Sequence, residues 1–236
     1  MSNDKGILYL VPIPIADGVL QTLSPEIGQY TLEIKHYFVE NIRTARRFLK
    51  ALHPSIVIDE LQFSEIDKHE GPDMGLLRKW LKEENKVGVM SESGCPGIAD
   101  PGAELAAVAH SIGAKVVPLT GPSSLLLALM ASGLNGQSFC FNGYLPVKDP
   151  ERSKKIKALE QTSKKERQTQ LFIETPYRNN PLLEELLKNC EQGTRLCIAQ
   201  NITAPNAYIK TQTIADWKKN KPTLEKLPAI FLILAG

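Results

Sequence analysis

The sequence predicts an α/β fold in two parts, and three observations support this prediction. Short apolar runs alternate with segments of helical spacing along most of the 236 residues, as in proteins built from strand-turn-helix units. Several apolar runs end in turns rich in glycine and proline, most clearly at residues 91–102. The amino-acid composition changes after Gly133, and a highly charged segment follows. We therefore expect an N-terminal domain over residues 1–118 and a C-terminal domain over residues 119–236.

The first half carries the more regular alternation. Its short apolar runs predict strands at residues 7–11, 36–39, 56–58, 87–90 and 115–119. Apolar positions at helical spacing predict helices at residues 41–52, 74–81 and 103–111, while residues 21–30 are polar and carry Ser24-Pro25 as a cap. Residues 60–71 are acidic and polar, which predicts a loop. Repeated strand-turn-helix units favour parallel pairing of these strands.

The second half begins with an apolar helix and ends with an apolar strand. We expect helices at residues 125–131, 146–165 and 182–190. The expected strands are residues 139–144, 170–174, 195–200, 208–213 and 229–235, of which 208–213 is either a strand or one arm of a hairpin. Because the glycine-rich turns follow predicted strands, we expect a ligand between the two halves.

Composition excludes several classes of protein. The apolar content of 42% and charged content of 23% are ordinary for a globular protein, and the net charge is only +2. The four cysteines form no C-x-x-C pair, so we expect neither a zinc site nor disulfides. No apolar run approaches the roughly 20 residues of a membrane span, and the N-terminus is unlike a signal peptide. We expect a cytoplasmic protein without a metal.

Two clusters of positive charge stand out against the low net charge. Each is either a solvated helix face or a surface for RNA. The first comprises Arg43, Arg46, Arg47 and Lys50, and the second comprises Arg152, Lys154, Lys155, Lys157, Lys164, Lys165 and Arg167.

Residues 91–102 are the first candidate for a ligand-binding loop. Gly94, Gly97 and Gly102 permit a ligand to approach the main chain, because they lack a Cβ atom. Pro96 and Pro101 remove amide donors, so the loop offers mainly carbonyl groups and apolar surface. It matches neither a P-loop nor a G-x-G-x-x-G fingerprint. The alternative is that these residues only form a tight connection.

Two further turns are candidates for the same site. Residues 12–18 follow the first predicted strand, and residues 120–124 follow the fifth. Ser123 or Ser124 stands where an N-cap residue of the next helix is expected, beside free helix amides. This turn alternatively caps the helix and has no other role.

These loops resemble a known family. Ser91-Glu-Ser-Gly-Cys-Pro-Gly-Ile-Ala-Asp-Pro-Gly102 is similar to S-D-A-G-T-P-G-I-S-D-P-G, found in a group of the tetrapyrrole methylase superfamily that 2′-O-methylates a cytidine of small-subunit ribosomal RNA. Supporting matches are Thr120-Gly-Pro-Ser-Ser124, Ser132-Gly-Leu134, Gly143-Tyr-Leu-Pro146 and Glu174-Thr-Pro-Tyr-Arg178, the last similar to E-S-P-H-R. The resemblance extends over nearly the whole chain.

The resemblance implies two α/β domains, each with a mixed sheet flanked by helices. It also implies a homodimer, and a cleft between the domains that holds S-adenosyl-L-methionine. The residues that would line the cofactor pocket are Ile13, Cys95, Pro96, Gly97, Ile98, Ser123, Ser124, Glu174, Ala199, Gln200 and Ala229. The expected partner is ribosomal RNA or the small ribosomal subunit, with no membrane and no metal.

The chain departs from the group at charged positions. It has Glu40-Asn-Ile-Arg43 in place of E-D-T-R, and Ala199-Gln-Asn-Ile-Thr-Ala204 in place of A-R-E-L-T-K. A ribose hydroxyl is a poor nucleophile, so we select Glu40 and Glu174 as candidate bases. The candidate phosphate contacts are Arg43, Arg46, Arg47 and Arg178. Alternatively, Glu40 caps the helix that follows it, and the arginines form a solvated face.

Two other functions remain open from the sequence. One is C-methylation of a tetrapyrrole, which would require a wide apolar trough. The other is binding of the cofactor or of RNA without turnover, suggested by the charges missing at Asn41, Gln200 and Asn201.

Overall fold

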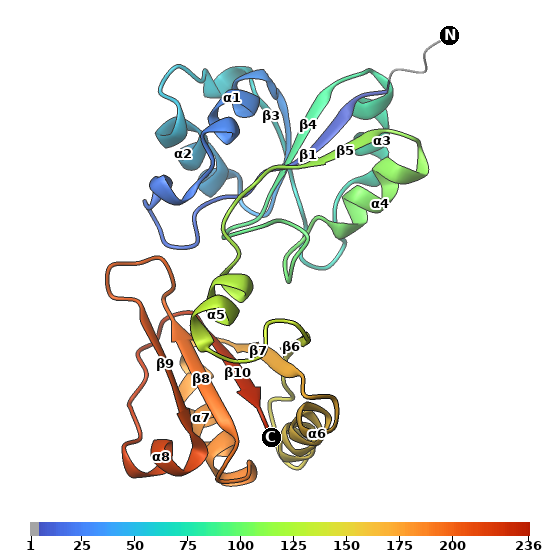
Figure 1. Ribbon diagram of the computed structural model, residues 1–236. Coiled ribbons are helices and arrows are strands. Elements are labelled where there is room, and N and C mark those ends of the chain that lie inside the picture. Colours follow the sequence, from blue (N-terminus) through green and yellow to red (C-terminus); the bar gives the residue numbers. More distant parts are fainter. Residues whose placement is uncertain (1–4) are drawn as a thin grey trace. The chain divides into compact units, whose positions relative to one another are not determined.

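The computed structural model describes residues 5–236, and these form two compact units (Figure 1). The first unit extends to Ser123 and the second begins at Ser124. This division falls a few residues after the predicted boundary between residues 118 and 119. No helix within residues 5–236 is long and apolar enough to cross a membrane.

The first unit contains a five-stranded sheet in the order β3-β2-β4-β1-β5. Its strands are β1 (Ile7–Leu10), β2 (His36–Val39), β3 (Gln62–Glu65), β4 (Lys86–Met90) and β5 (Lys115–Pro118). The family resemblance implies a mixed sheet and the repeated strand-turn-helix units predict parallel pairing; all the pairings of these described strands are parallel. The reason is that each strand is joined to the next by a helical crossover, which returns the chain to the same end of the sheet.

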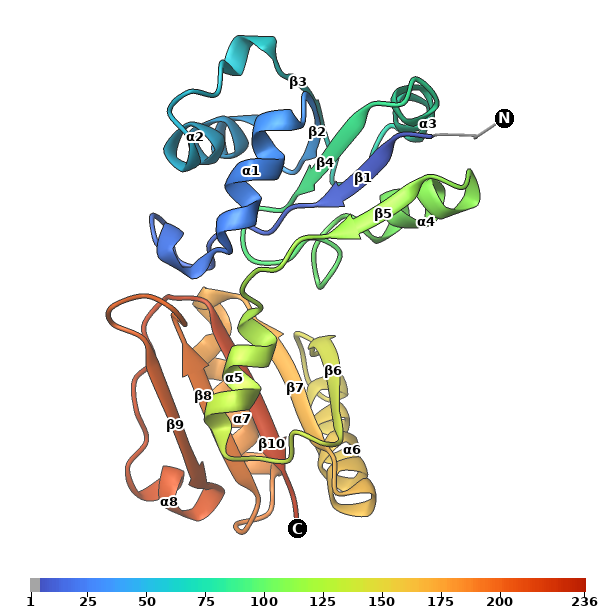
Figure 2. The ribbon, with the colours of Figure 1, turned by 45° about the horizontal axis from the view of Figure 1, so that its top comes forward.

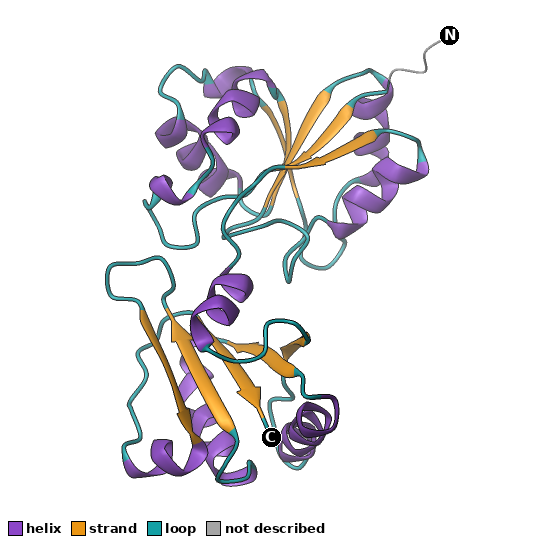
Figure 3. Cartoon of the chain, in the orientation of Figure 1, coloured by secondary structure: helices purple, strands orange, loops and turns teal. Residues whose placement is uncertain are grey.

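Helices cover both faces of the first sheet. They are α1 (Pro25–Glu33), α2 (Ile42–Leu52), α3 (Met74–Lys82) and α4 (Ala103–Ser111). Figure 3 shows helices on either side of the strands of this sheet. Tyr9 and Tyr37 pack with the α1 and α2 side, whereas the neighbouring Leu8 and Phe38 pack with the α3 and α4 side. Successive strand residues point to opposite faces, so each strand contributes to two apolar cores.

The second unit contains a mixed sheet in the order β6-β7-β10-β8-β9. Its strands are β6 (Phe139–Tyr144), β7 (Thr169–Glu174), β8 (Arg195–Gln200), β9 (Tyr208–Thr213) and β10 (Ala229–Leu234). β6 and β7 are parallel, and the other pairs are antiparallel. The strand that comes last in sequence therefore lies at the centre of this sheet.

Helices also cover both faces of the second sheet (Figure 2). They are α5 (Ser124–Ser132), α6 (Glu151–Glu166), α7 (Asn179–Asn189) and α8 (Ile214–Lys219). Ile230 and Leu232 of β10 pack with α5, whereas Phe231 and Ile233 pack with α6, α7 and α8. A short 3₁₀ helix, η3 (Pro176–Arg178), joins β7 to α7.

Three segments differ from the sequence prediction. Residues 56–58 form no strand, and the short 3₁₀ helix η2 (Ile58–Glu60) begins there instead. β3 lies inside residues 60–71, which we expected to be a loop. β3 is an edge strand that pairs with β2 and has Phe63 as its single apolar residue, so its pattern is weak. The helix α8 was not predicted either.

Gly88 allows Tyr37 to pack between β2 and β4. A Cβ atom at Gly88 would lie 2.6 Å from two ring carbons of the fully buried Tyr37. We expect Gly88→Ala to lower the free energy of unfolding by about 1–3 kcal/mol, because the ring has no room to move. Urea unfolding measures this difference. Gly136→Ala is the matched control, since nothing lies within 4 Å of its added Cβ atom; an equal loss there would contradict the packing argument.

Candidate functional site

The loops that follow β1, β4 and β5 meet at the carboxyl edge of the first sheet. The Ile13 amide donates to the Gly94 carbonyl at 2.9 Å. The Cys95 thiol donates to the Pro122 carbonyl, with 3.3 Å between sulfur and oxygen. A Cβ atom added at Gly121 would overlap the Pro12 ring. The three loops selected from the sequence are therefore packed against one another.

These loops border an open hollow of about 290 Å³. Its volume is close to the lower limit for small-molecule sites, about 300 Å³. Four expected cofactor residues contribute to its wall, together with side chains from β1, α4 and the segment after β5. The lining residues are Leu10, Pro12, Cys95, Pro96, Gly97, Ile98, Gly102, Ala103, Ala106, Pro118 and Leu119.

The geometry of loop 91–102 agrees with the reason for expecting glycine there. Gly94, Gly97 and Gly102 all have positive φ angles, of 71°, 82° and 136°. A Cβ atom at Gly102 would lie 3.0 Å from the Gly97 amide nitrogen, so these two glycines permit a tight turn. Burial is the main cause that raises the pKa of the Cys95 thiol, which is thereby kept as a neutral hydrogen-bond donor.

A second hollow, of about 670 Å³, lies beside the same edge. Ile13 and Phe48 supply apolar wall, and Arg47 and Glu92 supply charge. Arg47 forms a loose ion pair with Asp17, with 3.8 Å between nitrogen and oxygen. Of the three arginines selected on α2, Arg47 is the one that lines this hollow.

The other two arginines of α2 are placed differently. Arg46 is paired with Asp59 at 3.0 Å, and Arg43 is exposed. Their contact with a phosphate stays a prediction.

Glu40 holds a loop and does not cap α2. Its Oε2 accepts a hydrogen bond from the Glu92 amide at 2.7 Å. The N-cap of α2 is Asn41, whose side chain accepts from the Thr44 amide at 3.0 Å. The asparagine that replaces an acidic residue of the family pattern thus has a structural role.

Asp100, which the sequence analysis did not select, shares a third hollow with Glu40. This hollow has a volume of about 390 Å³. Burial, together with the negative charges of Glu40 and Glu92, raises the pKa of Asp100 to about 6. Asp100 belongs to the loop 91–102. The sequence signal that could have identified it is its position in this loop, between Pro96-Gly97 and Pro101-Gly102.

We expect Asp100→Asn to raise the unfolding temperature at pH 8. A folded-state pKa near 6, above the ordinary 3.8, means that ionisation of Asp100 reduces stability as the pH rises through this range. The gain should therefore vanish below pH 3.8, where the carboxyl is protonated in both states. Thermal unfolding at several pH values tests this, with Asp59→Asn as the exposed control. A gain that is equally large at low pH would contradict the assignment.

Three of the expected residues of the second unit, Glu174, Ala229 and Gln200, lie in one row across its sheet. Ala229 is in register with both Glu174 and Gln200, and Ala199 is in register with Ile230. The Gln200 amide donates to the Glu225 carbonyl at 2.8 Å. Gln200 therefore tethers the segment before β10. Ser123 ends the first unit and Ser124 begins α5.

The expected cofactor residues are thus distributed over two units. That all of them contact one ligand stays a prediction.

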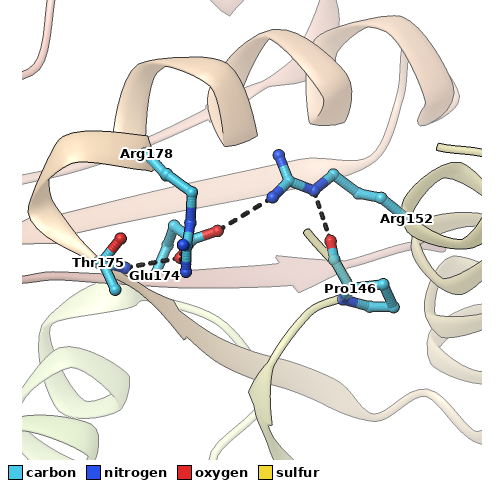
Figure 4. Close-up of polar contacts among 5 residues, drawn as sticks. All are labelled: Pro146, Arg152, Glu174, Thr175 and Arg178. Carbon is cyan, nitrogen blue, oxygen red and sulfur yellow. Dashed lines mark hydrogen bonds and ion pairs between the residues drawn. The ribbon is translucent and has the colours of Figure 1, made fainter. Parts of the chain in front are cut away.

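Glu174 is the centre of a buried ionic network (Figure 4). Its Oε1 accepts from Arg178 Nη2 at 2.7 Å, from Arg178 Nε at 2.9 Å and from the Thr175 amide at 2.7 Å. Its Oε2 accepts from Arg152 Nη2 at 3.2 Å. Arg152 Nε donates to the Pro146 carbonyl at 2.6 Å. Both carboxylate oxygens of Glu174 are therefore occupied.

This network disfavours Glu174 as a base. Burial alone raises the pKa of its carboxyl group, but the hydrogen bonds from Arg178 and Thr175 and the arginine charges outweigh burial and lower the pKa. A carboxylate with a lowered pKa is a weak proton acceptor. Glu174 therefore positions two arginines and the loops that carry them. Its role as a base stays a prediction, which these contacts disfavour.

Arg152 was treated as one of a run of surface charges, yet only 5% of it is exposed. The sequence contained a signal that Arg152 is buried. Arg152 stands at helical spacing before Ile156, Leu159 and Ser163, which form the buried face of α6.

Comparison with curated proteins finds relatives with one shared description. The chain is 29% identical over 237 residues to "Ribosomal RNA small subunit methyltransferase I" of Buchnera aphidicola subsp. Schizaphis graminum, covering 99% of this chain and 80% of the relative. It is 31% identical over 235 residues to the protein with the same name from Synechocystis sp., covering 98% and 79%. No family model matches the chain.

Solved structures share the fold at low sequence identity. The methyltransferase CobJ superposes with a TM-score of 0.63 at 17% identity, covering 98% of this chain and 94% of that one. Diphthine synthase superposes with a TM-score of 0.66 at 14% identity, covering 98% and 90%. The fold is therefore the one expected from the tetrapyrrole methylase resemblance. Together with the sequence identity to the Synechocystis protein over nearly the whole chain, this shows that the chain belongs to the ribosomal RNA small subunit methyltransferase I family.

Proposed function

We propose that this methyltransferase transfers a methyl group from S-adenosyl-L-methionine to a ribose 2′-hydroxyl of small-subunit ribosomal RNA. The observation that carries the proposal is the 290 Å³ hollow, because the family's longest motif forms its wall. The names of the curated relatives support the substrate.

The residues of this hollow fit the cofactor chemically. Pro12, Ile98 and Leu119 offer apolar surface for the adenine and the methionine chain. Prolines at positions 96 and 101 remove amide donors from the loop and leave carbonyl oxygens there, which suits a ligand with a positive charge and an amino group. When bound there, S-adenosyl-L-methionine supplies an electrophilic methyl group attached to a sulfonium.

The chain itself contributes orientation and charge. Positioning of the hydroxyl against the methyl group accounts for much of the acceleration in such a transfer, because effective molarity supplies several kcal/mol. The hollow beside Arg47 offers apolar wall for a base and a cation for a phosphate. Asp100 and Glu40 are the proposed proton acceptors, and the raised pKa of Asp100 supports this role near neutral pH.

Methyl transfer to isolated small ribosomal subunits tests the proposal. The subunits come from a bacterial strain that lacks the corresponding methyltransferase, and the methyl group of the cofactor is radiolabelled. We expect label in the ribosomal RNA, retained in an alkali-resistant dinucleotide because a 2′-O-methyl group blocks cleavage of the adjacent phosphodiester. Label in a base, or label in an added tetrapyrrole precursor with none in the RNA, would contradict it.

A further inference from the structure

Two exposed tyrosines lie at neighbouring strand ends of the second unit. Tyr144, 59% exposed, ends β6, and Tyr177, 78% exposed, lies in η3 after β7. β6 and β7 are parallel neighbours, and Tyr144 is in register with Ile173, the residue before Glu174. Large exposed aromatic side chains at one edge of a sheet typically mark a binding surface. We name Tyr144, Tyr177, Arg178 and Lys226 the tyrosine surface.

Two cations belong to the tyrosine surface. Lys226 Nζ lies 5.4 Å from the centroid of the Tyr177 ring, within the range of a cation–π contact. Hydrogen bonds to Glu174 are the main cause that raises the pKa of Arg178, and Tyr144 adds a smaller electrostatic contribution. Arg178 uses Nε and Nη2 for Glu174, and its side chain remains 37% exposed. Aromatic rings with cations beside them suit nucleic acid.

The buried network fixes the two loops that carry the tyrosines. Glu174 joins Arg178, next to Tyr177, to Arg152, which in turn holds the Pro146 carbonyl two residues after Tyr144 (Figure 4). Two arginines face one carboxylate, so the network leaves a net positive charge at this edge. A surface that is held in place before binding loses less entropy when it binds.

We propose that the tyrosine surface binds a single-stranded segment of RNA, with Tyr144 and Tyr177 stacking on unpaired bases and Arg178 and Lys226 contacting phosphates. This inference rests on the proposed function, since it assigns where the RNA substrate contacts the second unit. Single strands are favoured over duplexes, because only unpaired bases expose a face to an aromatic ring. A second copy of this chain is the competing occupant.

Fluorescence anisotropy with a labelled oligouridylate tests this assignment on the full chain. Stacking on one aromatic side chain contributes about 1–3 kcal/mol, so Tyr177→Ala should weaken binding by about tenfold or more, and Tyr144→Ala likewise. Tyr177→Phe should retain the affinity, because the ring persists. Both tyrosines are exposed, so thermal unfolding should show that the variants are folded.

Lys226→Ala has a matched control in Lys210→Ala. Lys210 Nζ lies 5.6 Å from the Trp217 ring, so both substitutions remove a cation–π contact. Lys226→Ala alone should weaken binding and reduce the salt dependence by about one phosphate contact.

Three results would overturn the assignment. They are unchanged affinity in both tyrosine-to-alanine variants, equal affinity for a duplex, and a dimer in sedimentation that Tyr177→Ala dissociates.

Failure of the proposed function would give a different set of results. If the unmodified protein methylates small subunits but the tyrosine variants keep the Kd for RNA and the KM for subunits, the tyrosine surface is wrong and the function stands. If the unmodified protein transfers no methyl group but loses RNA affinity in the variants, the function is wrong and the surface stands.

Discussion

Replacing Glu174 by glutamine is expected to lower the free energy of unfolding of the second unit by about 3–5 kcal/mol. The side chains of Arg152 and Glu174 are 6% and 0% exposed, so the variant leaves a guanidinium buried without its counter-charge. Surface ion pairs contribute less than about 1 kcal/mol. The matched control is therefore Glu191→Gln, which breaks the exposed pair with Lys164.

The measurement can be confined to the second unit. The two tryptophans are Trp80 in the first unit and Trp217 in the second, and both are buried. In a Trp80→Phe background, the fluorescence of Trp217 during urea unfolding reports the second unit alone. Glu174→Gln and Glu191→Gln are compared in this background.

The pH dependence of this effect has a defined sign. The folded-state pKa of Glu174 is lowered from 4.5, so its stabilisation is present above pH 4.5 and is lost as the pH falls through the folded-state value. The difference between the parent and Glu174→Gln should therefore shrink in acid. A difference that stays constant down to pH 3 would show that the charge of Glu174 is not its cause.

Replacing Ile98 by tryptophan is expected to abolish binding of S-adenosylhomocysteine. Ile98 lines the 290 Å³ hollow and is 49% exposed, so an indole at this position can occupy the hollow without disturbing the core. Calorimetric titration should show micromolar affinity for the parent and a loss of at least about 100-fold for the variant, equivalent to about 2.7 kcal/mol. Gly97→Trp would be less selective, because Gly97 has a φ of 82°.

Val57→Trp is the control for this experiment. Val57 is 53% exposed in the same unit and lies outside the residues that line the hollow. It should leave the affinity unchanged. Equal binding by Ile98→Trp and the parent would place the cofactor elsewhere, and no binding by the parent would remove the cofactor proposal.

The elements that sequence predicted best are those whose side chains are buried on both faces. β4 and β10 consist mainly of apolar residues, because helices cover both faces of each sheet. Edge strand β3 and the six-residue helix α8 were missed, since each has too few buried positions to form a periodic pattern. A hydrophobic pattern in the sequence reflects buried side chains, and β3 and α8 have few of them.

The candidate site shows the same distinction. Glycines of the loop 91–102 were identified because a tight turn requires particular backbone angles, which are a local property. The contacts of Glu174 could not be predicted, since they depend on Arg152, which is distant in sequence and reaches Glu174 through the packing of α6. Gln200 likewise has its partners in the segment before β10. Pairings between distant side chains leave no local pattern.

The central position of β10 has a consequence for synthesis of the chain. β7 and β8 both pair with β10, so a growing chain carries two strands without their shared neighbour until residues 229–234 have left the ribosome. The first unit has a comparable delay, because β1 and β2 both pair with β4, which follows them in sequence. Unpaired strand edges promote association with other chains. The interval between the emergence of β8 and β10 is therefore a stage of biogenesis at which a chaperone would protect the second unit.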